Sequence, residues 1–363
     1  MSAPRRIVRR IHLWLGLSLG ALMVLAGLTG SVLVFYVEID GWLHPEQAAQ
    51  GTANARSYDN AIVTLRRAFP DKHGPWRIEV TGKPGAIPTR YYEPPETRGR
   101  DFAPMMVWLS PDGQRVLRRD FWGDYAMTWV YDLHYRLLLG KAGGVVFGYA
   151  GLALLALLLT GLWVWWPRGS LAKALRFKQK APPVRRLRDW HKLAGLAGLP
   201  LLLMLTATGV MLALPDESNG LLAALFGPAQ EMPSPLPGHA EGPDIPPSAA
   251  MTAAAASMPR ARLAWLEIPG HGHAPYRLRM QQPGDPSRRF PHSFVWIDRH
   301  TSRILAFTDS TRAGAGGQIS NWLHPLHDGS AGGIVLRLLA IFAGLAPIAL
   351  FVTGVLRYRL RRR

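Results

Sequence analysis

The sequence predicts a membrane protein: an all-α bundle of four transmembrane helices with two α+β domains outside the membrane. Three observations lead to this fold class. Apolar residues are concentrated in four blocks without Asp, Glu, Lys or Arg, and each block is close to the ~20 residues that cross a bilayer as a helix. Basic residues gather at one set of block ends. The two long loops between blocks carry strand patterns.

The apolar blocks divide the chain into nine predicted segments. The first block exceeds a signal-peptide core and lacks a small-residue cleavage site, so we expect it to be a retained anchor. In chain order the segments are a cytoplasmic N-terminal arm (1–12), helix one (13–36), a first exterior domain (37–133), helix two with an exterior extension (134–166), a basic cytoplasmic connector (167–192), helix three (193–214), a second exterior domain (215–323), helix four with an exterior extension (324–357) and a cytoplasmic tail (358–363).

The formal charge of +18 lies almost entirely on one side of the predicted membrane. The connector 167–192 holds nine Lys and Arg against the single Asp189, whereas the loop 37–133 has 12 basic and 13 acidic residues and the loop 215–323 has nine of each. This is the positive-inside pattern, which places both termini and the connector in the cytoplasm. Because these basic runs are topology signals near helix ends, they argue against a nucleic-acid partner and leave the lipid bilayer as the predicted environment.

Each exterior loop has the pattern of an apolar strand, a polar turn and a second apolar strand. The first reads "APMMVWLSPDGQRVLRRDFWG" and the second "HSFVWIDRHTSRILAFTDS". A helix-like piece precedes each hairpin, around 58–68 and around 249–257. The stretch 215–250 is rich in Pro, Ala and Gly and predicts a flexible entry to the second domain.

The helices repeat at two fixed offsets, which predicts an internal duplication. Helix one matches helix three at 179 residues, and helix two matches helix four at 193 residues. The first offset aligns His12 with His191, Gly16 with Gly195, and Thr29-Gly30 with Thr208-Gly209. The second aligns His134 with His327, Gly151 with Gly344, and Thr160-Gly161 with Thr353-Gly354.

The four matched histidines form one pair on each side of the predicted membrane. His12 and His191 lie at the cytoplasmic ends of helices one and three, and His134 and His327 precede helices two and four on the exterior side. Two imidazoles from two helices suit the axial positions of a haem iron. The chain has no cysteine, which excludes disulfides and iron–sulfur clusters, and zinc would need a third ligand that neither pair offers. A single interfacial histidine, by contrast, is more often only an amphipathic anchor.

Several neighbours are candidates for the exterior site. Arg136, Lys141 and Arg337 could contact the haem propionates. In "NWLHPLHDG" the 193-residue offset selects His327 over His324, which becomes a neighbour of the exterior haem edge or an alternative ligand. Pro325, between the two, argues against a regular helix there.

Five motifs in this order resemble the PepSY-associated transmembrane-helix proteins, which include iron-regulated inner-membrane proteins and ferric-siderophore reductases with two haems b. The resemblance covers nearly the whole chain. It implies two PepSY-like periplasmic domains on an inner-membrane bundle, and haem-binding histidines at His12, His134, His191 and His327. The motifs are "RRIHLWLGLSLG", "FYVEIDGWLHPE", "DLHYRLLLG", "RDWHKLAGLAGLP" and "HPLHDGSAGG".

The function that the resemblance implies is electron transfer across the inner membrane to Fe(III) in a ferric siderophore, with release of Fe(II). No catalytic residue is assigned beyond the haems. The sequence offers no Gly-rich nucleotide loop, so we expect no flavin or nicotinamide site, and the electron donor is expected to be a separate reductase, a quinol or a small reductant. Two alternatives stay open: a transmembrane cytochrome that serves a protein partner, and a non-enzymatic PepSY-type membrane regulator.

Overall fold

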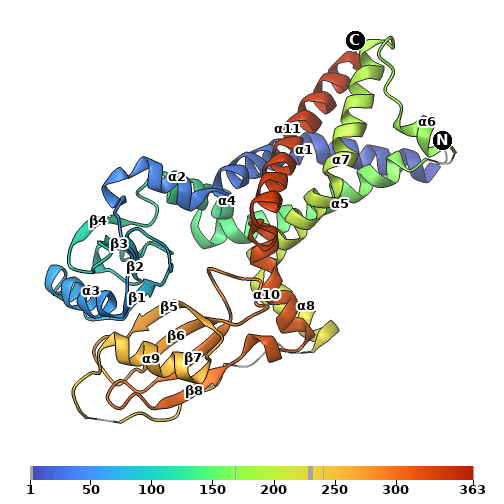
Figure 1. Cartoon of the computed structure of the whole chain (residues 1–363). Coiled ribbons are helices and arrows are strands. Elements are labelled where there is room, and N and C mark those ends of the chain that lie inside the picture. Colours follow the sequence, from blue (N-terminus) through green and yellow to red (C-terminus); the bar gives the residue numbers. More distant parts are fainter. Residues whose placement is uncertain (1–2, 168, 228–231, 240, 363) are drawn as a thin grey trace. The chain divides into compact units, whose positions relative to one another are not determined.

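The computed structural model describes residues 3–167, 169–227, 232–239 and 241–362 (Figure 1). The chain divides into two compact units, each built from segments that are distant in the sequence. The helical unit comprises Met1–Tyr36, Val130–Ser218 and Leu323–Arg363, and the sheet unit comprises Val37–Trp129 and Asn219–Trp322.

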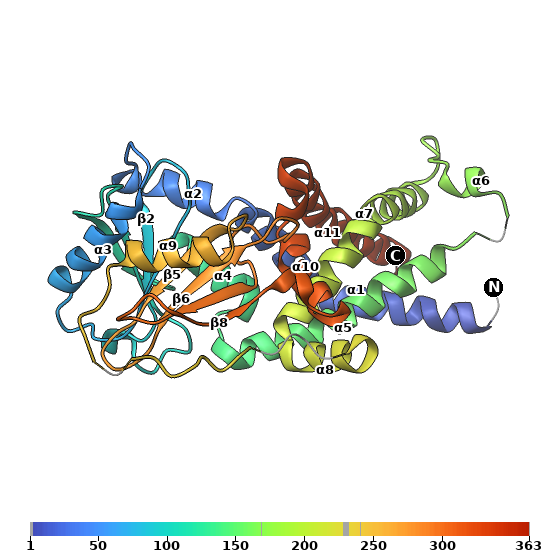
Figure 2. The same cartoon turned by 60° about the horizontal axis from the view of Figure 1, so that its bottom comes forward.

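Four long helices make up most of the helical unit, and each is long and apolar enough to cross a membrane. Each packs chiefly against two others, so that contacts close a ring in the order α1, α5, α7, α11. Figures 1 and 2 show the α1–α5 pair diverging from the α7–α11 pair toward the start of α1 and the end of α11. The helices are α1 (Ala3–Leu33), α5 (Gly140–Trp165), α7 (Pro183–Ala213) and α11 (Gly333–Arg362).

Two of these helices begin about ten residues before the predicted spans. α1 begins at Ala3, inside the predicted arm, and α7 begins at Pro183, inside the predicted connector. Apolar runs mark only the part of a helix that can lie in lipid, whereas Arg, Lys and Leu are good helix formers on either side of that boundary. Pro183 also suits a first helical position, where its missing N–H costs nothing. His12 and His191 therefore lie well inside continuous helices.

The predicted segments 134–166 and 324–357, each a helix with an exterior extension, contain a break in the helix just after the histidine. The short helix α4 (Ala126–Arg136) ends before α5 begins, and α10 (Ala315–His327) ends before α11 begins. Left-handed backbone makes the turn in both places, at Gly140 with φ 60° and at Gly333 with φ 57°. These two glycines are themselves 193 residues apart, the same offset that relates the histidines.

The break after α4 is a tight turn that hydropathy alone does not reveal. Leu137 and Leu138 both have positive φ, an uncommon conformation for residues with a side chain. A Cβ on Gly143 would lie 1.9 Å from the Arg136 carbonyl oxygen, so only glycine permits this approach. In the other half α10 runs through Pro325, against the sequence-based expectation, because one proline removes only one helical hydrogen bond.

The two exterior loops build one sheet, not two separate domains as the sequence suggested. Eight antiparallel strands follow the order β4-β3-β2-β1-β5-β6-β7-β8, so β1 of the first loop pairs directly with β5 of the second. The edge strand at the start of each four-stranded meander can pair with its counterpart, which removes two exposed edges. The strands are β1 (Trp76–Glu79), β2 (Ile87–Tyr91), β3 (Met105–Leu109), β4 (Val116–Phe121), β5 (Arg262–Ile268), β6 (Tyr276–Gln281), β7 (Ser293–Ile297) and β8 (Ile304–Thr308).

One face of this sheet carries the hydrophobic core. Strand residues such as Ile78, Leu266 and Leu278 are fully buried against α3 (Ala55–Ala68) and α9 (Pro247–Ser257). Alternation along each strand sends every second side chain to this face and the others to the opposite face. The two helices also contact one another, since the Ser248 backbone N–H donates to the Asp59 carboxylate at 2.8 Å.

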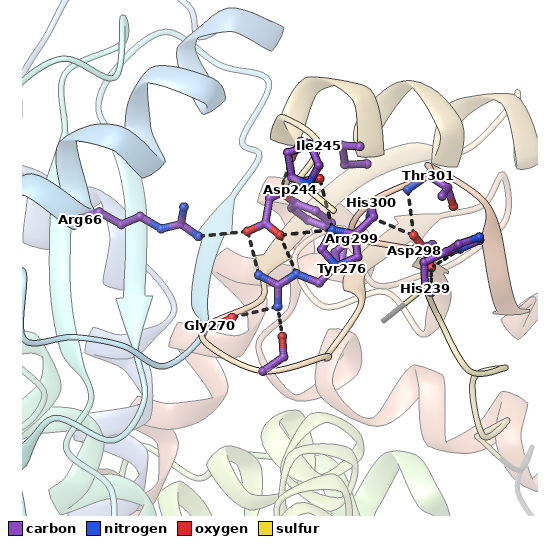
Figure 3. A network of polar contacts seen from close by, with 12 residues as sticks. Arg66, His239, Asp244, Ile245, Gly270, Tyr276, Asp298, Arg299, His300 and Thr301 are labelled. Atoms are coloured by element: carbon purple, nitrogen blue, oxygen red, sulfur yellow. Dashed lines mark hydrogen bonds and ion pairs between the residues drawn. The ribbon is translucent and has the colours of Figure 1, made fainter. Parts of the chain in front are cut away.

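A polar network joins the two loops at the end of the sheet unit (Figure 3). Arg299 donates twice to the Asp244 carboxylate, at 2.7 Å each, and Arg66 of α3 lies 3.9 Å from the same group. The buried Asp298 carboxylate accepts backbone N–H groups of His239 and His300, at 2.7 and 2.8 Å. These contacts stabilise loops, and they give His300 a structural role.

The remaining short elements connect these parts. Part of the stretch predicted to be flexible is regular, because α8 (Pro215–Phe226) continues the chain after α7. The other elements are α2 (Tyr36–Leu43), α6 (Leu171–Leu175), and the 3₁₀ turns η1 (Pro45–Gln47), η2 (Pro95–Thr97), η3 (Ser310–Arg312) and η4 (Ser330–Gly332).

Candidate functional site: two histidine pairs

The helical unit brings the four sequence-predicted histidines together as two pairs. The ring centres of His12 and His191 lie 6.2 Å apart, and those of His134 and His327 lie 6.1 Å apart. All four side chains are half-buried. Each pair takes one histidine from the first half of the chain and one from the second, so each site is complete only when the two halves pack together.

Each imidazole is fixed at Nδ1 by the Thr of a Thr-Gly pair on the neighbouring helix. The distances from Nδ1 to the threonine Oγ1 range from 2.9 to 3.3 Å. In each half, the histidine of the long helix α1 or α7 packs on the Thr-Gly pair of α5 or α11, and the histidine of the short helix α4 or α10 packs on the Thr-Gly pair of α1 or α7. The contacts join His12 to Thr160, His134 to Thr29, His191 to Thr353, and His327 to Thr208.

The threonine hydroxyls determine which ring nitrogen carries the proton. Each hydroxyl donates its own proton to a carbonyl one turn back in its helix; for Thr29 this is Leu25, at 2.7 Å, and for Thr208 it is Met204, at 2.8 Å. The oxygen can then only accept from the imidazole, so Nδ1 carries the hydrogen. A backbone carbonyl three residues before the threonine accepts from the same Nδ1; for His327 this is Leu205, at 3.0 Å. Nε2 therefore keeps a free lone pair in every ring.

The glycine that follows each threonine makes room for the imidazole. A Cβ on Gly30 or Gly161 would lie 3.0 Å from Cε1 of the histidine, and on Gly209 it would lie 2.9 Å away. These distances are shorter than ordinary van der Waals contact, so an alanine would push the ring out of position. At Gly354 the corresponding distance is 3.7 Å, which leaves space for a methyl group.

The Thr-Gly pairs contact the candidate ligands, and the sequence pattern revealed them only as markers of the repeat. Their offsets of 179 and 193 residues are the same as those of the histidines. The shared offset could therefore have identified the Thr-Gly pairs as candidate contacts of the histidines, because they repeat in the same register as the predicted ligands. What the sequence could not supply is which helix each pair faces.

The ring separations match two imidazoles on opposite sides of one iron atom. With metal–nitrogen bonds of about 2 Å and ring centres roughly 1 Å from their nitrogens, two such rings have centres roughly 6 Å apart. A haem iron takes four ligands from its porphyrin and needs only two from the protein. In the described part of the chain no group of three or more His, Cys, Asp or Glu is placed to hold a metal ion, so a typical zinc site is not supplied. The donor set and the glycine cradles therefore fit haem.

The two pairs lie far apart along the bundle. On α1, His12 belongs to one pair and Thr29 contacts the other, and these positions are 17 residues apart. At the rise of an α-helix this is about 25 Å, close to the thickness of a hydrocarbon core. α7 repeats the spacing with His191 and Thr208. Between the pairs the bundle is apolar, with a buried cluster that includes Met23, Leu154, Leu157, Leu158 and Leu202.

The other predicted site residues have different surroundings. His324 pairs with Asp328, with Nδ1 at 3.3 Å from the carboxylate. Arg337 donates to the Val34 carbonyl at the end of α1, at 3.1 Å from Nε, and lies over a neighbouring aromatic ring. The Arg136 guanidinium lies 5.2 Å from the Tyr135 ring centre, and Lys141 is in the first turn of α5. These contacts use some of the hydrogen-bonding and stacking capacity of each side chain. Contact of the cations with haem propionates stays a prediction.

Sequence comparison assigns the chain to a family. The model of the PepSY-associated TM region matches residues 9–361, which is almost the entire chain. The chain belongs to the PepSY-associated TM region family. No curated protein matches it. This PepSY-associated TM protein therefore combines four membrane-spanning candidates with an eight-stranded sheet unit, and its two histidine pairs lie within the matched region.

Proposed function

We propose that this protein is a di-haem b reductase of the inner membrane that passes electrons to Fe(III) in a siderophore complex and releases Fe(II) for uptake. One observation carries the proposal: the two histidine pairs have ring centres 6.2 and 6.1 Å apart, and every Nδ1 has a fixed acceptor. This is the protein's share of two bis-imidazole haem sites. The haems would supply one-electron redox chemistry.

The chain's own residues position the ligands and keep water out between them. The threonine and carbonyl acceptors hold Nδ1–H, which leaves Nε2 as the nitrogen that would bind a haem iron and would make the imidazole a stronger donor. The apolar cluster around Met23 and Leu202 lies between the pairs, where a charged species would be costly to place. Electrons can cross such a region while ions cannot.

The charge distribution supports an orientation for this proposal. Basic residues lie near the His12/His191 end, and the loops that form the sheet unit are nearly neutral. We infer that both termini are cytoplasmic and that the sheet unit, formed by two duplicated PepSY-like halves, is periplasmic. Electrons would then enter at His12/His191 from a cytoplasmic reductase, a quinol or a small reductant, and leave near His134/His327. Reduction releases iron because Fe(II) suits hard oxygen donors less well than Fe(III) does.

A visible absorption spectrum of the purified protein tests the proposal. From haem-sufficient cells we expect the bands of a low-spin b-type cytochrome, with about two haems per chain by pyridine haemochrome. His324→Ala is the matched control, because this histidine belongs to neither pair and should leave the spectrum unchanged. A colourless wild-type preparation would refute the reductase and favour a non-enzymatic membrane protein.

The pairing is tested by single replacements. His12→Ala and His191→Ala should each remove the same haem, and His134→Ala and His327→Ala should each remove the other. Loss of one and the same haem in His134→Ala and His191→Ala would show that the pairing is wrong.

The electron acceptor is tested by stopped-flow oxidation of the dithionite-reduced protein. Ferric chelates should reoxidise both haems within seconds. If chelates of several chemical classes leave the haems reduced, the protein serves a protein partner and not a siderophore.

A further inference from the structure

The face of the sheet that points away from α3 and α9 gathers arginines from three strands. Cross-strand neighbours share a face of a sheet. Arg77 on β1 is opposite Arg90 on β2 and opposite Glu267 on β5, and Glu267 is opposite Arg277 on β6. Arg279, two residues further along β6, returns to the same face. We call Arg77, Arg90, Arg277 and Arg279 the arginine face.

Positive charge on the arginine face exceeds the negative charge around it. The Glu267 carboxylate accepts from both Arg77 and Arg277, at 2.7 Å each. In the part of the chain that the structure describes, the guanidinium groups of Arg90 and Arg279 have no hydrogen-bond or ion-pair partner. Of the four guanidinium groups, two share the Glu267 carboxylate and two make no ion pair, while Glu79 on the same face is paired with Arg289.

Aromatic rings surround these two arginines. The Arg90 guanidinium lies 5.0 Å from the Trp265 ring centre, and that of Arg279 lies 4.8 Å from the Phe294 ring centre. Cation–π contacts hold guanidinium planes in place but leave their N–H groups able to donate. A flat or oxygen-rich anion could therefore bind these N–H groups without displacing existing hydrogen bonds.

The arginine face is partly withdrawn from water, which makes its excess charge costly. Burial, and then repulsion from Arg77 and Arg277, lowers the pKa of Arg279 to about 10. The exposed fraction of the side chain is 21% for Arg77 and 33% for Arg277, so a ligand can reach the face. Charges that are half-buried without partners gain most from an added anion.

We propose that the arginine face binds the iron substrate and that this substrate is an anionic ferric chelate with carboxylate or catecholate donors. The inference rests on the proposed reductase function and adds the chemical class of its substrate. Fe(III) prefers hard oxygen donors, and complexes with carboxylates or catecholates keep a net negative charge that guanidinium groups bind bidentately. A neutral ferric trihydroxamate lacks that charge and is expected to bind poorly.

The test is binding of gallium(III) citrate to the full-length protein in detergent, followed by tryptophan fluorescence or calorimetry. Gallium(III) has the ligand preferences of Fe(III) but cannot be reduced here, so binding is measured apart from electron transfer. The variant is Arg90→Gln/Arg279→Gln, which removes two charges without breaking a hydrogen bond or an ion pair among the described residues. Arg56→Gln/Arg67→Gln is the matched control, because both arginines are exposed on α3 and the change in charge is equal.

We expect at least about tenfold weaker binding of gallium citrate by Arg90→Gln/Arg279→Gln, from the loss of two charge-assisted donors, with the control unchanged. The haem spectrum and the thermal unfolding of the variant should equal those of the wild type. Undiminished binding by the variant would overturn the proposal, and so would equal binding of a neutral gallium trihydroxamate. Arginine-dependent binding of short-chain phosphatidylglycerol, with none of gallium citrate, would assign the face to a lipid headgroup and also overturn it.

Two outcomes separate this inference from the proposed function. Unchanged rates of ferric citrate reduction in Arg90→Gln/Arg279→Gln would refute the substrate site while the reductase stands. Arginine-dependent binding of gallium citrate by a preparation without haem would support the site while the reductase fails.

Discussion

Replacing Thr208 by valine removes one hydroxyl and almost no volume from the buried contact with His327. In the wild type, His327 Nδ1 has two acceptors, Thr208 Oγ1 at 3.1 Å and the Leu205 carbonyl at 3.0 Å. The Leu205 carbonyl remains in Thr208→Val, so the ring should keep its place and its tautomer. The substitution therefore changes the basicity of the imidazole more than its position.

The size of the effect follows from losing one of two neutral hydrogen bonds, worth about 1 kcal/mol. A hydrogen bond to Nδ1–H strengthens the imidazole as a donor and favours the ferric state, so its loss should raise the reduction potential. Since a tenfold change in a one-electron equilibrium is about 59 mV, a loss of about 1 kcal/mol corresponds to at most about 40 mV. Haem affinity at the same site should fall by up to about tenfold.

Redox potentiometry of the purified protein, followed in the visible haem bands, measures this shift. Only the haem that His327→Ala removes should shift, and it should shift upward. Thr206→Val is the control, since Thr206 is on the same helix two residues away and makes no hydrogen bond to a histidine among the described residues. A shift in the other haem, or wild-type potentials and haem content in Thr208→Val, would refute the assigned role of the Thr-Gly pairs.

Two further predictions follow from the same structure. Gly209→Ala should lower haem content at the His327 site, because the new Cβ would lie 2.9 Å from the ring. Gly354→Ala should be tolerated, because the corresponding distance to His191 is 3.7 Å. Equal haem loss in both variants, measured by pyridine haemochrome, would contradict this. Asp298→Asn should destabilise the sheet unit by about 2 kcal/mol at neutral pH, the value of hydrogen bonds to a charged group. Burial raises the pKa of Asp298, but three backbone N–H donors outweigh burial and hold the pKa below its usual range, so this stability is present above about pH 4 and is lost as pH falls below it. The unfolding curves of wild type and variant, followed by circular dichroism, should therefore converge in acid; a constant gap down to pH 2 would count against the assignment.

The sequence predicted the helical architecture well because its signals are local. A run of about 20 apolar residues without charge has few alternatives to a membrane-spanning helix. The sequence was less successful where a boundary depends on backbone geometry. The left-handed turns at Gly140 and Gly333 separate each predicted exterior extension from its long helix, and Pro325 is inside a helix. Apolar content carries no information on such turns.

The sequence pattern did not predict which strands pair when they are far apart in the chain. Both strand hairpins were predicted, but they were assigned to separate domains. The pairing of Trp76–Glu79 with Arg262–Ile268 makes one sheet from two loops that are separated by about two transmembrane helices in the chain. Nothing in either strand specifies its partner, because every strand edge can pair through the same backbone groups.

By itself, the sequence determined that this protein has four apolar helices, one-sided basic charge, and histidines in register with Thr-Gly pairs at offsets of 179 and 193 residues. Only the tertiary structure decided that each Thr-Gly pair holds a histidine of the adjacent helix at Nδ1, and that the paired rings lie 6.2 and 6.1 Å apart. The physical reason is that apolar periodicity places a residue in or near the membrane, whereas distances between side chains of different helices depend on how glycines let those helices approach.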